Sequence, residues 1–238
     1  MSPDQSSLGW KDLRFAAFPE QVVEMVMDSI ATGQLRGGDR LTEKWLSDSL
    51  GVSRTPMREA LRILSAKGLV KLRPNAGAVI NLPDAREAAD LVDVMAWLWE
   101  KVAHLAAERI TGEQLASITA LHERMCAVCG SDRSLEWAKL NRQFHDEIVL
   151  CSGNRVLCEL ALNLQMRIYL CFAIGRRPPQ RQLQANEEHS GIVNFLAQRD
   201  AEKLASQMIA HTRRAFETAY DEGVIARLSN PEAVLKLG

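Results

Sequence analysis

Hydrophobic residues recur at helical spacing through most of the chain, and strand-like runs occur only between residues 69 and 82. Three short helices are predicted before these runs: the first starts near Pro19, Thr42 caps the second and Ser53 caps the third. Beyond residue 83 the pattern predicts helix after helix, which is typical of an antiparallel all-helical bundle. The predicted fold class is therefore mainly α. We expect a small domain at 10–82, an all-helical domain at 83–223 and a C-terminal tail at 224–238.

The third predicted helix, from Ser53 to Lys67, has two different faces. An apolar stripe lies on one face, whereas Arg54, Arg58 and Arg62 lie four residues apart on another. A solvated arginine face is common on surface helices, so the arginines alone do not indicate a function. The order of the elements adds to them, because two helices, a capped third helix and two strand-like runs form a winged helix-turn-helix. This pattern favours DNA binding.

The charge is unevenly distributed along the chain. The formal net charge of −1 would argue against nucleic acid, but residues 53–73 carry six basic residues and a single acid, Glu59. That segment has a net charge of +5, and the rest of the chain sums to −6. No apolar run approaches the roughly 20 residues of a membrane span, and Met1 to Ser7 do not look like a signal peptide. We therefore expect a cytoplasmic protein with no membrane partner.

Three stretches of the N-terminal segment form a dense, ungapped motif: Arg40–Glu43, Leu50–Leu64 and Lys67–Val70. This motif closely resembles the DNA-binding domain of GntR-family regulators. The resemblance implies that Arg54 and Arg58 enter the major groove, where arginine bonds guanine O6 and N7, and that Thr55 bonds a phosphate. Many relatives have an arginine where this chain has Ala76, so the wing contacts would either be weaker or use Asn75. The predicted DNA-contacting residues are Lys44, Ser53, Arg54, Thr55, Arg58, Arg62, Asn75 and Gly77.

Three histidines lie on the apolar stripes of three predicted helices in the second domain. They are His145, His189 and His211. Buried imidazoles need polar partners, and a divalent metal held by their neutral nitrogens would satisfy all three together. The other interpretation is that each histidine separately bonds a carboxylate or a carbonyl. The spacing alone leaves both open.

The same region resembles the FCD domain, the effector domain of the FadR-type branch of the GntR family. The matching motifs are Asn141-x-x-x-His145, Gly153-Asn154, Glu188-His189 and Met208-x-x-His211. The resemblance implies that Asn141, His145, His189 and His211 coordinate a divalent ion, zinc or another first-row metal such as nickel or manganese. It also implies that a small carboxylate effector occupies the open positions of the metal.

Two positions depart from the FCD pattern. Asn141 replaces an aspartate of many relatives, and its amide oxygen is a neutral, weaker ligand. Ala96 replaces an arginine that can clamp a carboxylate. Either another group meets the effector, with Arg167 as one candidate, or the effector is not a typical organic acid.

Together these features predict a homodimeric, ligand-responsive transcriptional repressor rather than an enzyme. It would bind a pseudo-palindromic operator in double-stranded DNA and sense a small metabolite, an organic acid. One alternative is a metal-dependent hydrolase, in which Glu188 is the candidate general base although helical geometry points it away from the face of His189. The other alternative is a regulator whose metal is purely structural.

Overall fold

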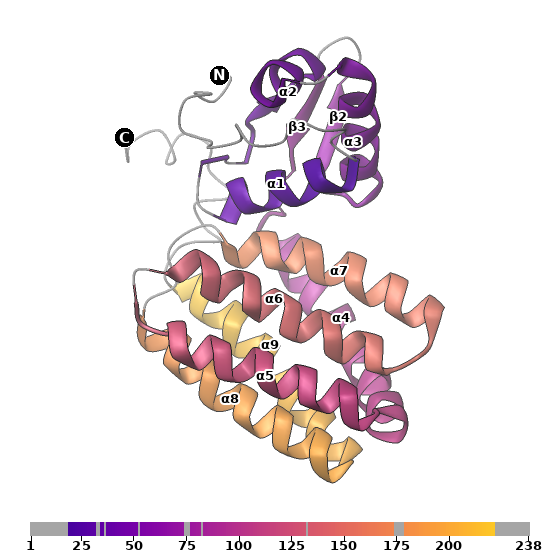
Figure 1. Ribbon diagram of the computed structural model, residues 1–238, viewed down its shortest axis with the longest axis vertical. Coiled ribbons are helices and arrows are strands. Elements are labelled where there is room, and N and C mark those ends of the chain that lie inside the picture. Colours follow the sequence, from indigo (N-terminus) through magenta and orange to yellow (C-terminus); the bar gives the residue numbers. More distant parts are fainter. Residues whose placement is uncertain are drawn as a thin grey trace.

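Two bodies, one small and mixed and the other larger and helical, are stacked on each other in Figure 1. The computed structural model describes residues 19–31, 34–35, 37–51, 53–73, 77–81, 83–131, 133–173 and 179–221. The predicted tail at 224–238 and the start of the predicted first domain lie outside these ranges.

The small body is a winged helix-turn-helix, as the sequence predicts. Its elements in chain order are α1 (Pro19–Ala31), β1 (Arg40–Leu41), α2 (Glu43–Leu50), α3 (Arg54–Ala66), β2 (Val70–Arg73) and β3 (Gly77–Ile80). The three strands form an antiparallel sheet in the order β1-β3-β2. The apolar faces of α1 and α3 are buried together in one core with Leu46, Leu69 and Ile80.

The helix ends follow the predicted signals with one exception. The Thr42 hydroxyl accepts a hydrogen bond from the Trp45 backbone N–H at 3.0 Å and caps α2. Gly51 ends α2 in the left-handed conformation, with φ of 67°. Ser53 occupies the extended N-cap position of α3, but its side chain makes no capping hydrogen bond, so the prediction of a side-chain cap is wrong.

The larger body is an all-helical bundle. Its elements are α4 (Ala85–Arg109), α5 (Gly112–Val128), α6 (Ser134–Cys151), α7 (Arg155–Ala173), α8 (Pro179–Gln198) and α9 (Ala201–Asp221). Trp99, Trp137 and Phe144 fill the centre of its core. Within the described ranges, no helix is long and apolar enough to cross a bilayer.

The two bodies meet where α1 lies against α6 and α7, and Figure 1 shows α7 directly beneath the winged domain. Met166 and Tyr169 of α7 pack against the winged core. Two ion pairs join α1 to α6: Glu24 pairs with Arg142, and Asp28 Oδ2 lies 2.5 Å from Lys139 Nζ. The Lys67 ammonium also donates to Asn163 Oδ1 at 3.3 Å.

Gly77, at the start of β3, must be glycine for two reasons. Its φ is +81°, and a Cβ there would lie 2.4 Å from the Leu41 carbonyl oxygen in β1. Gly77→Ala should therefore destabilise the winged domain by at least about 2 kcal/mol, measured by denaturant unfolding of the full chain. Gly38→Ala is the matched control, because Gly38 has φ of +86° but open space around its Cβ position. Equal losses in the two variants would contradict the packing role of Gly77.

Candidate functional site

The predicted reading helix α3 presents its basic face to solvent. Ser53, Arg54, Thr55, Arg58 and Arg62 are all exposed, whereas Met57 and Leu61 of the same helix are buried. Arg62 Nη1 lies 3.6 Å from Glu59 Oε2 on the same helix. The arrangement leaves the predicted base-contacting residues accessible to DNA.

Arg58 is held by an acidic side chain from the preceding helix. Its Nε and Nη2 donate to the two carboxylate oxygens of Glu43 at 2.7 and 2.9 Å. These hydrogen bonds lower the pKa of the Glu43 carboxyl below its usual value. Because a bidentate pair fixes the plane of the guanidinium, Glu43 sets how Arg58 faces its surroundings.

A basic groove runs between α3, the start of α2 and the wing, which is the hairpin of β2 and β3. Lys44 and Arg58 line it together with Arg62 and Gly77, all of which the sequence singles out. Arg40 of β1 and Arg73 of β2 complete its basic lining, and they are absent from the predicted set. Asn75 and Ala76 lie outside the described residues, so the wing-tip contact stays a prediction.

The three predicted histidines come together in the bundle. His145 of α6, His189 of α8 and His211 of α9 place one ring nitrogen each within 4.8 Å of one another. His189 and His211 are buried, and their Nε2 atoms are 3.4 Å apart. Two ligands of a tetrahedral zinc ion with bonds of about 2.0–2.1 Å lie about 3.3–3.4 Å apart, so this spacing fits a shared metal.

Asn141 provides an independent reason for a ligand at this place. It lies one turn before His145 on α6 and is buried, and it borders a cavity that opens beside the histidines. Its Oδ1 atom is buried and has no hydrogen-bond partner among the described residues. Since a buried acceptor without a partner is costly, the Asn141 oxygen also fits as a ligand atom.

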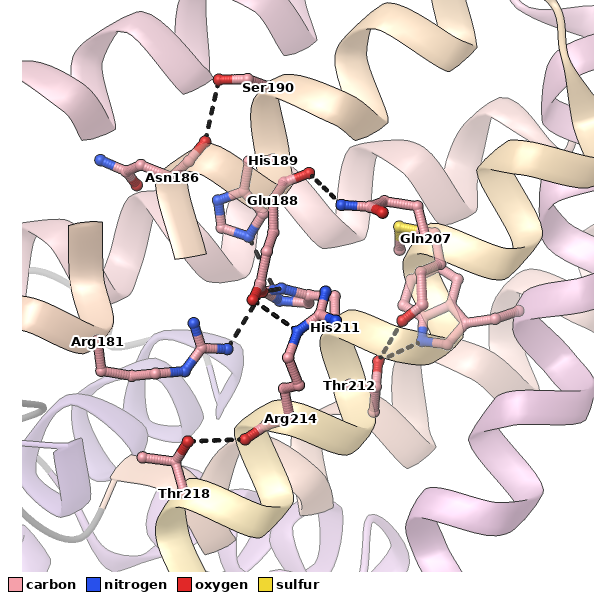
Figure 2. A network of polar contacts seen from close by, with 12 residues as sticks. Arg181, Asn186, Glu188, His189, Ser190, Gln207, His211, Thr212, Arg214 and Thr218 are labelled. Carbon is pink, nitrogen blue, oxygen red and sulfur yellow. Dashed lines mark hydrogen bonds and ion pairs between the residues drawn. The ribbon is translucent and has the colours of Figure 1, made fainter. Parts of the chain in front are cut away.

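Glu188 orients His211 through Nδ1, the ring nitrogen that does not face His189, and Figure 2 shows these three residues together. Its Oε2 lies 2.5 Å from His211 Nδ1 and accepts from Arg181 Nη2 at 3.2 Å, and its Oε1 accepts from Arg214 Nε at 2.8 Å. A carboxylate on Nδ1 keeps the proton there and leaves Nε2 as the lone-pair donor. The Glu188 side chain binds His211, Arg181 and Arg214. It therefore points away from His189, which is what its position on the helix predicts.

A cavity of about 280 Å³ opens beside the histidine cluster. His145 and His211 border it together with the apolar side chains of Met95, Trp99 and Ile168. The buried Gln165 Nε2, also on its wall, has no hydrogen-bond partner among the described residues. The cavity wall therefore combines apolar side chains with polar and charged groups that converge on it, as in small-molecule sites whose polar groups fix the orientation of the ligand.

The arginine on this wall is Arg142 rather than Arg167. Arg167 pairs with Glu87 at the start of α4 and packs against Gly68, outside the cavity lining. Arg142 borders the cavity next to Asp146, whose carboxyl pKa burial raises to about 6 against the opposing effect of Arg142. This position of Arg167 gives no support to the predicted effector contact.

Comparison with known protein families agrees with both halves of this arrangement. Residues 18–80 match the bacterial regulatory proteins of the gntR family, and residues 90–214 match the FCD domain. The chain belongs to the GntR family. As a GntR-family protein with an FCD domain, it is a DNA-binding transcriptional regulator.

Individual regulators are similar to this chain over most of their length. The Nta operon transcriptional regulator of Aminobacter aminovorans is 30% identical over 76% of this chain and 85% of its own. The Glc operon transcriptional activator of Escherichia coli K12 is 29% identical over 85% of this chain and 89% of its own. The solved structure of E. coli McbR/YncC shares the fold, with a TM-score of 0.76 at 22% identity over 87% of this chain and 99% of that chain.

Sequence reasoning missed several side chains that complete the two GntR-family sites. The basic groove adds Arg40 and Arg73, and the histidine cluster adds Glu188 as an orienting group. The local charge excess of residues 53–73 includes Arg73 and could have drawn attention to it. No local signal indicates that Glu188 meets His211, because the contact depends on how α8 and α9 pack.

Proposed function

We propose that this transcriptional regulator senses a small organic acid in the bundle cavity, at a divalent metal held by Asn141, His145, His189 and His211. The observation that carries the proposal is the convergence of three imidazoles and a buried amide oxygen without a partner beside a cavity. The proposed ion is zinc or another first-row metal such as nickel or manganese, because neutral imidazoles suit these ions. When bound, the metal would supply open coordination positions for a carboxylate.

The cavity supports a small ligand rather than a long one. Its volume of about 280 Å³ lies just below the roughly 300–1,000 Å³ of typical ligand pockets. Trp99 helps to keep the wall rigid, because its indole N–H donates to the buried Thr212 hydroxyl at 3.0 Å. Gln165 offers a buried donor that a polar ligand group would satisfy.

Homodimerisation has support from apolar side chains on the outside of the bundle. Trp97 is 73% exposed on α4, and Val156 and Leu160 are exposed on the neighbouring helix α7. Large apolar side chains exposed on two neighbouring helices favour an interface, and a two-fold dimer would present two reading helices to a pseudo-palindromic operator. We further propose repression as the mode of action, because occupancy of the operator is sufficient for it.

The hydrolase alternative lacks the base that the sequence suggested for it. Glu188 is bound by His211, Arg181 and Arg214 and is not available to activate water. Membership of a family of regulators also favours sensing over catalysis.

Removal of the metal distinguishes a sensory ion from a structural one. We expect a chelator to abolish the response of operator binding to small acids, while the circular dichroism spectrum and the affinity for DNA remain. The reason is that the large apolar core of the bundle does not depend on the cluster. Unfolding after chelation would support the purely structural ion, and an unchanged acid response would contradict the proposed site.

A further inference from the structure

The cavity extends beyond the bundle to the winged domain. Two of its lining residues belong to that domain: Glu24 comes from α1, and Lys67 directly follows the reading helix α3. Met166 and Tyr169 border the cavity and also pack against the winged core. A ligand that fills the cavity would therefore contact both domains at once.

Arg142 connects the cavity wall to the joint between the domains. Its Nη1 donates to Glu24 Oε1 at 3.2 Å and its Nη2 to the other carboxylate oxygen, so the pair is bidentate. The Arg142 side chain is only 19% exposed, whereas that of Glu24 is 48% exposed. Glu24 can therefore turn into solvent, where water solvates its carboxylate, while Arg142 stays on the wall and needs another anionic partner.

The charges around Arg142 determine which ligand group would replace Glu24. Lys67 is the second cation on the wall, and Asp146 lies 3.9 Å from Arg142 Nη1. With Glu24 in place, the two cations and two anions balance. With Glu24 turned away, one positive charge remains uncompensated, which favours an anionic group.

We propose that Arg142 binds an anionic group of the effector in exchange for Glu24 and so releases an ion pair that holds α1 against α6. This inference rests on the proposed effector site and defines its ligand as a small acid with two anionic groups, one for the metal and one for Arg142. The exchange transmits binding to the DNA-reading domain, because α1 and α3 share one core.

Titration calorimetry of the zinc-loaded full-length protein with acetate, malonate, succinate and glutarate tests this exchange. We expect at least one dicarboxylate to bind more tightly than acetate. Glu24→Gln should raise the affinity for that dicarboxylate about fivefold and leave acetate unchanged, because the competing carboxylate is gone. Arg142→Gln should remove the preference for the dicarboxylate. Without ligand, both variants should shift operator affinity in the direction in which the dicarboxylate shifts the wild type.

The second ion pair between α1 and α6 provides matched controls. Asp28→Asn and Lys139→Gln remove the same charges from the same helices, but neither residue lines the cavity. Neither control should change acid binding. If acetate binds as tightly as every dicarboxylate, or if Glu24→Gln behaves like Asp28→Asn, the Arg142 exchange is wrong although the metal-bound effector stands. If neither zinc nor any acid binds the wild type, the proposed function itself fails.

Discussion

Arg58→Ala is expected to abolish specific operator binding while leaving the fold and the histidine cluster intact. An arginine bonded to a guanine typically contributes a factor of about 5 to 150 in affinity at each half-site. A dimer that reads two half-sites would lose the square of that factor. Arg58 is an exposed residue on α3 and is not part of the buried apolar stripe, so its removal should hardly affect unfolding.

The measurement is fluorescence anisotropy at fixed salt, with an operator selected by the wild-type protein from random duplexes and a scrambled duplex beside it. Arg62→Ala is the control on the same helix, since Arg62 is predicted to meet phosphate or solvent. It should weaken binding to both duplexes to a similar, smaller extent. An Arg58→Ala protein that still prefers the operator would refute the assignment of α3 as the reading helix.

His145→Ala is expected to lower the affinity for the metal strongly, because it removes one of the proposed ligands. Loss of an outer-shell partner typically lowers metal affinity about 10- to 100-fold, and loss of a ligand should lower it by at least about 100-fold. A metal present at about 100 times its dissociation constant stabilises the folded state by about 2.7 kcal/mol. Zinc should therefore raise the melting temperature of the wild type by about 5–10 °C and that of the variant hardly at all.

His122→Ala is the matched control for this experiment. His122 packs 6.4 Å from the His189 ring, between centroids, but its Nε2 lies 2.9 Å from the Ser190 hydroxyl, and it is not part of the cluster. Its removal should leave the zinc-dependent stabilisation intact. If both variants respond to zinc like the wild type, the ion binds elsewhere or not at all, and the three histidines are bonded to one another and to the protein.

Features that depend on neighbouring residues in the chain could be predicted from the sequence. The Thr42 cap, the Gly51 helix end and the buried stripe of α3 all follow from local patterns. The inward orientation of the three histidines follows from the apolar residues three and four positions away. That orientation is sufficient to propose a cluster without knowing how the helices pack.

Features that depend on the packing of separate elements could not be predicted in this way. β1 has two residues and exists because Arg40 and Leu41 pair with Val79 and Ala78 of β3. The pair between Glu24 and Arg142 joins residues 118 positions apart, and its formation depends on the angle between α1 and α6. Arg167 points to a different partner for the same reason: the rotation of α7 turns it toward Glu87.

The pair between Glu43 and Arg58 has a consequence for how the protein searches along DNA. While the pair is closed, Arg58 contributes little to the attraction of the phosphate backbone, and binding to arbitrary sequences releases fewer counterions. Opening the pair costs two hydrogen bonds, which the O6 and N7 atoms of a guanine in the right position restore. The protein would therefore slide on weaker, less salt-sensitive contacts and stop where a guanine replaces the carboxylate.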